Sequence, residues 1–294
     1  MSAAGGLKPK TVIDGRFELV EKLDDRGAGE VWKARDPNFK TRFFLLKFLR
    51  RIDGDRAPDE LTALAQRLRK LKHPNLLPTL GHGQWEGRPY LVQGWFEGVS
   101  LSAALDAARA DGSRLSRGAL EGLCDQVGGA LEALHTQEPP WVHGELHPGC
   151  VLVGRAPDGA FDVRVMDAGV GPFAEGGTAF IYADCVAPER KEGRAPLAAG
   201  DVYSLATLMR RVLREASETA AYVAPFGGYR GREDVPAAVW AVMGRAMKHS
   251  PAERYESAGA MRAALRDAWQ TEALLEVRRP GEVKSEAPAE PRAS

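Results

Sequence analysis

The segment WVHGELHPGCVLVG, residues 141–154, gathers several chemically capable side chains into one short stretch. Glu145 is a carboxylate of the kind that accepts protons in general base catalysis. His143, His147 and Cys150 are of the types that bind zinc, although no fourth ligand of a closed zinc site is evident in the sequence. The stretch therefore predicts a catalytic loop, a metal site, or a catalytic loop that has lost essential residues.

A second candidate is Lys47, which lies inside the apolar run of residues 44–49, FLLKFL. Lysine is rarely placed among apolar neighbours unless its charge has a partner. A solvated surface lysine is thus the less favoured interpretation.

The composition excludes several classes of protein. The chain of 294 residues has 40 basic and 40 acidic side chains, so no net field would attract nucleic acid or an anionic membrane. The apolar runs are short and the start, MSAAGGLKPK, has no apolar core, so we expect no membrane span and no signal peptide. Three cysteines without CxxC spacing argue against a disulfide framework or a zinc ribbon. We expect a cytoplasmic protein.

Apolar segments separated by turn residues predict an antiparallel meander of strands in the first third of the chain, at residues 16–23, 30–36 and 41–49. One helix is predicted from about residue 59 to 71, followed by strands at 76–83 and 88–95 that meet at a Glu86-Gly87 turn. After residue 98 the apolar spacing becomes helical, with stripes at 120–134, 202–212, 239–247 and 261–269. The polar, Gly/Pro-bearing ends, 1–15 and 272–294, are predicted to be a flexible N-terminal arm and a disordered tail.

Eight short motifs then follow one another in a specific order. They are LDDRGAGEVW at 23–32, FLLK ending at Lys47, HPN at 73–75, HGELHPGCVL at 143–152, VMDAG at 165–169, APE at 187–189, DVYSL at 201–205 and PAERY at 251–255. In this order and spacing the sequence resembles the bacterial eukaryotic-like serine/threonine protein kinase family. The resemblance covers residues 16 to about 270. It implies an α+β, bilobal protein kinase-like fold, with a small antiparallel sheet lobe and one helix at 16–97 and a larger, mainly helical lobe at 98–271.

The resemblance assigns roles to the residues that the chain retains. It places Lys47 and Asp167 at the positions that hold the nucleotide's phosphates and magnesium, with Gly27, Gly29 and Val31 at the nucleotide. It implies a structural role for His143 in the catalytic loop, for Asp201 in tying that loop down, and for Glu189 and Arg254 as a buried ion pair. The structural place of His143 weakens the zinc interpretation.

The nucleotide-binding parts depart from the family pattern in two places. The glutamate that usually pairs with the lysine is replaced by Leu64, and Glu60 lies one helical turn too early unless the helix is shifted. Asp24 and Arg26 stand at two of the three glycine positions of the phosphate loop. Glycine lets backbone N–H groups approach phosphate, whereas an aspartate adds like charge.

The catalytic loop departs at its two chemical positions. Glu145 replaces the aspartate that receives the acceptor's proton, and misplacing a carboxylate by about 1 Å costs on the order of 100-fold in rate. Cys150 replaces the asparagine that holds a second magnesium, for which a soft sulfur is a poor ligand. Ala168 also replaces the phenylalanine of the D-F-G motif, and Tyr182 a threonine before APE.

We therefore expect a pseudokinase with weak or no phosphotransfer, in which ATP and magnesium bind weakly or not at all. It would act by binding a protein partner, such as an active kinase or its substrate, and neither nucleic acid nor a membrane. The alternative is a slow serine/threonine protein kinase that uses Glu145 as its base. A small-molecule phosphotransferase is less favoured: HGELHP resembles the loop of that class, but APE, DVYSL and PAERY belong to the protein kinase helical lobe.

Overall fold

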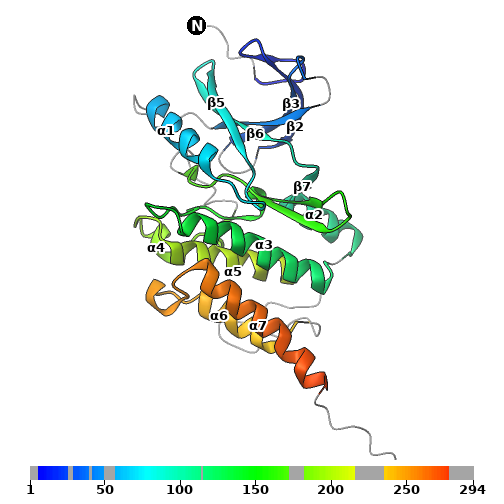
Figure 1. Ribbon diagram of the computed structural model, residues 1–294, viewed down its shortest axis with the longest axis vertical. Coiled ribbons are helices and arrows are strands. Elements are labelled where there is room, and N and C mark those ends of the chain that lie inside the picture. Colours follow the sequence, from blue (N-terminus) through cyan, green and yellow to red (C-terminus); the bar gives the residue numbers. More distant parts are fainter. Residues whose placement is uncertain are drawn as a thin grey trace, which may run out of the picture.

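A twisted antiparallel sheet forms the first lobe, at the top of Figure 1. The computed structural model describes residues 6–25, 29–39, 42–49, 57–113, 115–171, 182–215 and 235–277. The sheet has the order β1-β2-β3-β4-β6-β5. Its strands are β1 (Val12–Ile13), β2 (Phe17–Asp24), β3 (Gly29–Arg35), β4 (Phe43–Leu49), β5 (Thr79–Trp85) and β6 (Arg88–Gly94). Glu86 and Gly87 both have positive φ and form the predicted turn between β5 and β6.

The central strand β4 is buried on both faces, which explains its continuous apolar sequence. Successive side chains alternate between the faces. Leu46 and Phe48 join an outer cluster with Phe17 and Trp32, whereas Leu45 and Leu49 join the main core. Lys47 lies two residues from both Leu45 and Leu49, so its side chain is on the same face of β4 as theirs. The strand therefore directs the ammonium group of Lys47 toward the main core.

The single helix of this lobe, α1 (Ala57–Lys70), packs against β5 and β6. Leu61, Ala65 and Leu68 recur at helical spacing and are buried, while Glu60 is exposed. The helix matches the predicted one to within two residues at each end. It lies beside β5 in Figure 1.

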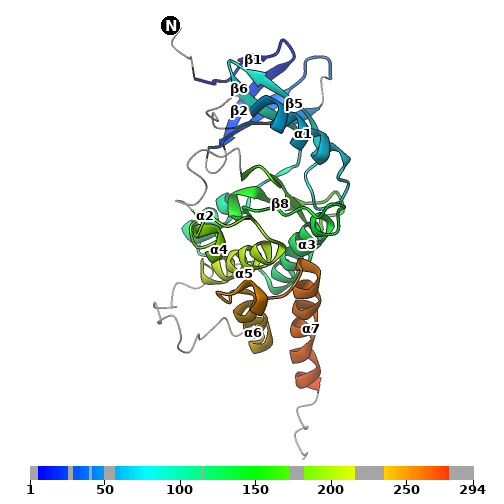
Figure 2. The same ribbon diagram turned by 90° about the vertical axis from the view of Figure 1, so that its left-hand side faces the viewer.

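The second lobe is mainly helical, as predicted, and lies below the sheet in both views (Figures 1 and 2). Its helices are α2 (Leu101–Asp111), α3 (Arg117–His135), α4 (Pro188–Lys191), α5 (Ala198–Glu215), α6 (Ala237–Ala246) and α7 (Ala258–Val277), with short 3₁₀ turns η1 (Pro148–Cys150) and η4 (Pro251–Glu253). A small sheet, β7 (Gly98–Ser100), β8 (Val151–Arg155) and β9 (Phe161–Val165), lies at its top. The predicted α+β bilobal arrangement is confirmed.

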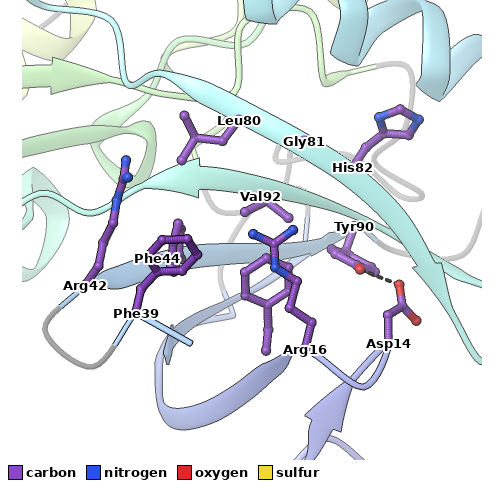
Figure 3. Close-up of a pocket in the computed structure, with 11 residues that line it drawn as sticks. Asp14, Arg16, Phe39, Arg42, Phe44, Leu80, Gly81, His82, Tyr90 and Val92 are labelled. Atoms are coloured by element: carbon purple, nitrogen blue, oxygen red, sulfur yellow. Dashed lines mark hydrogen bonds between the residues drawn. The ribbon is translucent and has the colours of Figure 1, made fainter. Parts of the chain in front are cut away.

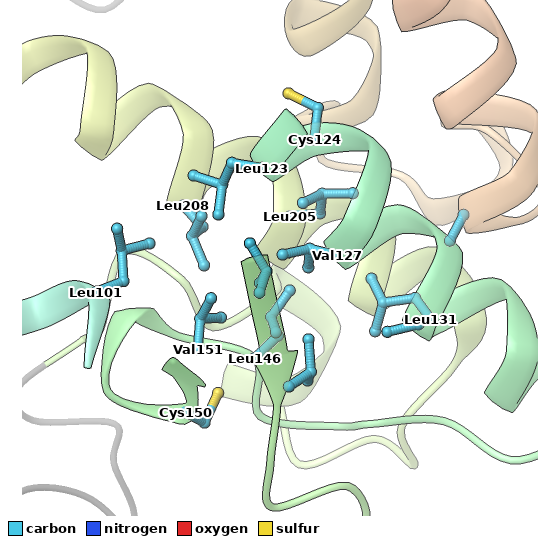
Figure 4. Packing of buried hydrophobic residues seen from close by; sticks show 14 of the residues in the cluster. Leu101, Leu123, Cys124, Val127, Leu131, Leu146, Cys150, Val151, Leu205 and Leu208 are labelled. Carbon is cyan, nitrogen blue, oxygen red and sulfur yellow. The ribbon is translucent and has the colours of Figure 1, made fainter. Parts of the chain in front are cut away.

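The core of this lobe surrounds the segment that carries the candidate chemistry (Figure 4). Val127 and Leu131 of α3 and Leu205 of α5 belong to the same buried cluster as Leu146 and Cys150. The loop between α3 and β8 is therefore anchored by apolar side chains, and it is not a free surface loop.

The ends of the described chain extend past the boundaries that composition suggested. Within residues 1–15, β1 pairs with β2 and Ile13 is fully buried. At the other end α7 continues past residue 271 to Val277, while residues 278–294 lie outside the described residues. In the part of the chain that the structure describes, no helix has the length and apolar character needed to cross a membrane.

Candidate active site

Lys47 and Asp167 meet between the two lobes. Lys47 lies in β4 between Val31 of β3 and Leu91 of β6, and its Nζ is 2.5 Å from Oδ2 of Asp167. The two side chains are 2% and 7% exposed. An ion pair this far from water is held strongly, because each charge has lost its hydration and depends on the other.

Asp167 has the geometry of a ligand as well as of an ion-pair partner. Its φ of 69° is in the left-handed region, which is uncommon for a residue other than glycine. Its Oδ1 atom is buried and has no hydrogen-bond partner among the described residues. A buried carboxylate oxygen without a partner is costly, and it is the hard donor that magnesium prefers.

Helix α1 supplies no partner for Lys47 within the described residues, where the ammonium group pairs with Asp167. Leu64 packs against the main core, and Glu60 points to solvent. The helix is thus not shifted by one turn to bring Glu60 to Lys47. The sequence predicted that the usual lysine–glutamate pair is lost, and this geometry agrees with that prediction.

A different contact joins α1 to the second lobe. The guanidinium group of Arg67 lies 4.3 Å from the centre of the Trp141 ring and donates to the carbonyl oxygen of Pro139 at 2.7 Å. Gly169 also lies close to this ring, since an added Cβ there would approach Trp141 Nε1 to 2.7 Å. Trp141 therefore connects α1 to the turn that follows Asp167, a contact that sequence reasoning did not identify.

Asp201, at the start of α5, holds the catalytic loop from below. Its two carboxylate oxygens accept the backbone N–H groups of His143 and Gly144 at 2.7 and 2.8 Å, and Nε2 of His135 lies 2.8 Å from Oδ2. Gly144 has a φ of 84°, which is why glycine suits this position. The tie between Asp201 and the loop is the one that the resemblance implied.

His143 links the loop to the segment around Asp167. Its Nε2 lies 2.9 Å from the carbonyl oxygen of Met166, and its own carbonyl oxygen accepts the N–H of Gly169 at 3.1 Å. The ring is 1% exposed. With both ring nitrogens engaged, Nδ1 with the N–H of Glu145, His143 is a structural residue.

Cys150 is buried and satisfied by its own loop. Its Sγ accepts the N–H of His147 at 3.2 Å and donates to the carbonyl oxygen of His147 at 3.0 Å. Burial, with a smaller effect from the nearby Asp167 charge, raises the pKa of this thiol well above its usual range. It is therefore a neutral thiol, and no group of three or more metal-ligating side chains occurs among the described residues. The zinc interpretation finds no support.

Glu145 is half-buried, and its carboxyl group lies against the backbone of Gly171. A Cβ at residue 171 would come within 2.8 Å of Glu145 Oε1. The Glu145 carboxyl group thus occupies the space that a side chain at residue 171 would take. The sequence identified Glu145 as a departure, but it did not predict this packing.

His147 and Tyr182 cover the outer side of the loop. Their rings stack with centroids 4.6 Å apart and an interplanar angle of 10°, and the Tyr182 hydroxyl donates to Ser102 Oγ at 2.8 Å. Burial, followed by the charge of Lys47, lowers the pKa of His147 well below its usual range, so the ring is neutral. Sequence reasoning placed Tyr182 at a family threonine position but missed the stack, because the two residues are 35 positions apart.

The first strands carry the remaining nucleotide-site candidates. Gly29 has a φ of 155°, and a Cβ there would be 1.9 Å from the carbonyl oxygen of Phe48, so the β3–β4 pairing itself requires glycine. Val31 is buried next to Lys47 in the sheet. Asp24 ends β2 and accepts the N–H of Asp25. Gly27 and Arg26 lie outside the described residues.

Glu189 and Arg254 form a buried, two-point ion pair. Arg254 donates from Nη1 and Nη2 to the two carboxylate oxygens of Glu189 at 2.8 and 2.7 Å. Its Nε donates to the carbonyl oxygen of Lys248 at 2.7 Å, and Nη1 donates to that of Ala199 at 2.9 Å. Although burial alone acts in the opposite direction, the Arg254 hydrogen bonds hold the pKa of Glu189 below its usual range. This is the ion pair that the resemblance implied.

The chain is similar to curated bacterial kinases. Serine/threonine-protein kinase PknD of Mycobacterium tuberculosis (strain ATCC 25618 / H37Rv) is 28% identical over 274 residues, which cover 87% of this chain and 40% of PknD. Serine/threonine-protein kinase Pkn1 of Myxococcus xanthus is 26% identical over 288 residues, covering 91% of this chain and 40% of Pkn1. The chain thus spans less than half the length of these relatives.

The chain also matches a solved kinase domain and a family model. The crystal structure of the Mycobacterium tuberculosis PknI kinase domain aligns with a TM-score of 0.69 over 90% of this chain and 100% of that domain, at 20% identity, which shows the fold. The family model described as protein tyrosine and serine/threonine kinase matches residues 17–261. Because that match spans most of the sequence and both lobes, the chain belongs to the protein tyrosine and serine/threonine kinase family.

Proposed function

We propose that this chain is a serine/threonine protein kinase-like domain with weak or no phosphotransfer, a pseudokinase that acts by binding another protein. The observation that carries the proposal is the state of Cys150. At the position where the resemblance implies a metal-binding asparagine, the structure has a buried neutral thiol that is fully engaged with the backbone of His147. Such a group offers magnesium no hard oxygen.

The nucleotide site is the part of the machinery that remains. Members of the family use ATP and magnesium, and the residues here fit one metal ion better than two. Asp167 Oδ1 is a buried oxygen without a hydrogen-bond partner among the described residues, and it would hold the ion. Magnesium bound there would neutralise phosphate charge. Lys47 would have to turn from Asp167 to the phosphates, and breaking a buried pair costs free energy, so we propose weak nucleotide binding.

The acceptor side supports the same proposal. Glu145, the base position, packs against Gly171, and the next residues of the loop are covered by the stacked rings of His147 and Tyr182. A hydroxyl group must lie within about 3 Å of a general base to lose its proton to it. Both the length of Glu145 and the Tyr182 ring disfavour that approach.

The scaffold, in contrast, retains its most costly interactions. Asp201 holds the backbone of the loop, and Arg254 with Glu189 forms a buried pair whose loss costs about 3–5 kcal/mol. A fold kept intact around an impaired reaction centre supports a role in binding. We propose that the partner is a protein, such as an active kinase or its substrate.

The first test is the melting temperature with ATP, with ADP and with an unhydrolysable ATP analogue, each with and without magnesium. A ligand that binds the folded state stabilises it by RT ln(1 + [L]/Kd). A shift that needs magnesium and disappears in Asp167→Asn supports the single-metal site. A magnesium-independent shift that survives this substitution contradicts it.

A slow serine/threonine protein kinase is the second candidate, and one observation favours it. The loop around Glu145 has an intact backbone, since the Glu145 N–H still points to His143 Nδ1 at 3.4 Å and Asp201 still anchors the preceding residues. This candidate requires that Glu145→Asp raises the rate of phosphate incorporation and that Lys47→Met abolishes it. A small-molecule phosphotransferase remains the less favoured function despite the HGELHP motif, because the matched family model is that of protein kinases.

A further inference from the structure

The outer face of the first lobe's sheet contains a pocket that is separate from the Lys47–Asp167 site. Its volume is about 440 Å³, and Figure 3 shows its walls. Side chains from the β1–β2 turn, the β3–β4 connection, β5 and β6 converge on it. Its floor is apolar and belongs to the outer cluster, through Phe17, Phe44 and Val92. A concave apolar floor of this size is typical of a binding site.

Two apolar side chains at the pocket remain exposed. Phe39 is 51% exposed and Leu80 is 36% exposed. The pairing of β5 with β6 shifts register between Thr79 and Gly81, so Leu80 is the extra residue of a bulge. A bulge redirects a side chain out of the regular alternation. Large exposed apolar side chains at the edge of an apolar pocket mark a surface that a partner covers.

The pocket also carries two ordered guanidinium groups. Arg16 lies over the Phe17 ring at 4.7 Å and Arg42 lies over the Phe44 ring at 5.4 Å. A guanidinium group stacked on a ring keeps its N–H edge available and loses little entropy when it binds a carboxylate. Arg16 is already paired with the buried Asp36 at 2.7 Å. Arg42, which is exposed, has no ion pair among the described residues.

The acidic group of the pocket is at the opposite end. Asp14 accepts a hydrogen bond from the Tyr90 hydroxyl, drawn as a dashed line in Figure 3, whereas Arg42 lies across the pocket beside Phe39. The pocket therefore has a positive end and a negative end, with aromatic rings between them. An occupant with a carboxylate toward Arg42 and an apolar group on the rings matches this arrangement.

We propose that this pocket, defined by Phe17, Phe39, Arg42, Phe44, Leu80 and Val92, binds an extended acidic segment of a partner protein through one aromatic anchor residue with a carboxylate on its Arg42 side. The anchor packs on the Phe44 side of the floor, and a carboxylate binds Arg42. The chain's own residues 278–294 do not have this chemistry, since they contain four basic and three acidic side chains and no aromatic residue. The proposal rests on the proposed protein-binding function, but not on the state of the catalytic loop.

The test uses the full chain and a fluorescein-labelled peptide probe, Gly-Asp-Glu-Phe-Asp-Glu-Gly, followed by fluorescence anisotropy. Matched probes replace the central phenylalanine with alanine or the four acidic residues with lysine. We expect the acidic aromatic probe to bind at least about tenfold more tightly than either matched probe, since each loses either apolar burial or charge-assisted hydrogen bonds. Equal binding of all three probes, or no binding of any, would overturn the proposal.

Two variants locate the binding. Arg42→Glu and Phe39→Ala change exposed side chains of the pocket, and each should weaken the acidic aromatic probe by about tenfold or more. Arg69→Glu makes the same charge change on the exposed face of α1 and should leave binding unchanged. Equal weakening by Arg69→Glu would show a nonspecific charge effect and would contradict the site. Nucleotide-dependent melting shifts should be the same in Arg42→Glu and in the unmodified chain. The proposal for the pocket and the proposal for the nucleotide site are therefore tested independently.

Discussion

Lys47 of β4 and Asp167 of the D-A-G turn are 120 residues apart in the sequence and form a buried ion pair that joins the two lobes. In this chain the pair substitutes for the lysine–glutamate contact to α1, because Leu64 occupies the expected position and Glu60 is exposed. The same two residues are those that the nucleotide would need. The pair therefore stabilises a state in which the Lys47 ammonium group is not available to phosphate, whereas Oδ1 of Asp167 has no partner among the described residues.

Removing one partner of this pair should destabilise the fold. Lys47→Met leaves the Asp167 carboxylate buried without its counter-charge, which costs about 3–5 kcal/mol. Lys47→Met combined with Asp167→Asn removes both charges and should cost less than Lys47→Met alone. Urea unfolding measures the free energies of Lys47→Met, of Asp167→Asn and of the double variant. Costs that simply add would show that the two side chains do not interact.

Gly29 and Gly244 should respond to alanine in opposite directions. At Gly29 a Cβ would lie 1.9 Å from the Phe48 carbonyl oxygen at a φ of 155°, so Gly29→Ala should lower the free energy of unfolding by about 1–3 kcal/mol. At Gly244, in the exposed face of α6, a Cβ meets nothing within 4 Å, so Gly244→Ala should raise it by about 0.5–1 kcal/mol. Thermal and urea unfolding provide the measurement, and an unchanged stability of Gly29→Ala would contradict the β3–β4 pairing described above.

Tyr182 and Ser102 should behave as one unit. The hydroxyl of Tyr182 donates to Ser102 Oγ at 2.8 Å, and both side chains are buried. Tyr182→Phe and Ser102→Ala should each cost about 1 kcal/mol, and the double variant should cost much less than their sum, because all three lose the same hydrogen bond. The stacked ring on His147 remains in Tyr182→Phe, so any larger loss in Tyr182→Ala reports the stack. If the free-energy costs of the two single variants simply add in the double variant, the two hydroxyl groups do not form this hydrogen bond.

His147 should make the fold sensitive to mild acid. Its pKa in the folded chain is well below the ordinary value near 6.5, so the unfolded chain binds a proton there that the folded chain does not. The free energy of unfolding should therefore fall as the pH is lowered through about 6.5, by up to about 1.4 kcal/mol per pH unit from this residue. At higher pH both states are neutral and the effect vanishes.

His147→Gln should remove this part of the pH dependence, whatever it does to stability at pH 8. His249→Gln is the matched control, because His249 is 80% exposed and should leave the slope unchanged. Urea midpoints between pH 5 and 8 give the slopes. Identical slopes in the unmodified chain and in His147→Gln would mean that the ring is protonated while folded.

The sequence predicted most of the fold because its apolar patterns are regular. The nearly continuous apolar run of residues 43–49 and the helical stripes of α3, α5, α6 and α7 each correspond to a described element. The boundaries were less accurate: β1 forms from only Val12 and Ile13, which is too short for any periodic signal and is stabilised by pairing with β2. A local sequence pattern cannot predict an element that depends on such tertiary contacts.

The site was predictable at positions with motifs and not elsewhere. The motif positions Asp201, Glu189 and Arg254 lie in short strings with a fixed order, and their geometry is the one that the resemblance implied. Contacts such as Arg67 on Trp141 depend on how two lobes meet, and no sequence spacing encodes them. The sequence showed that the glutamate on α1 is lost, but only the structure shows that Lys47 pairs with Asp167 instead.

The central claim is that the cleft does not transfer phosphate efficiently. The most direct measurement is single-turnover transfer of the γ-phosphoryl group of ATP to generic protein substrates and to the chain itself, with magnesium and with manganese. We predict that the unmodified chain does not exceed the background set by Lys47→Met. Robust transfer by the unmodified chain that is abolished in Glu145→Ala would contradict this account.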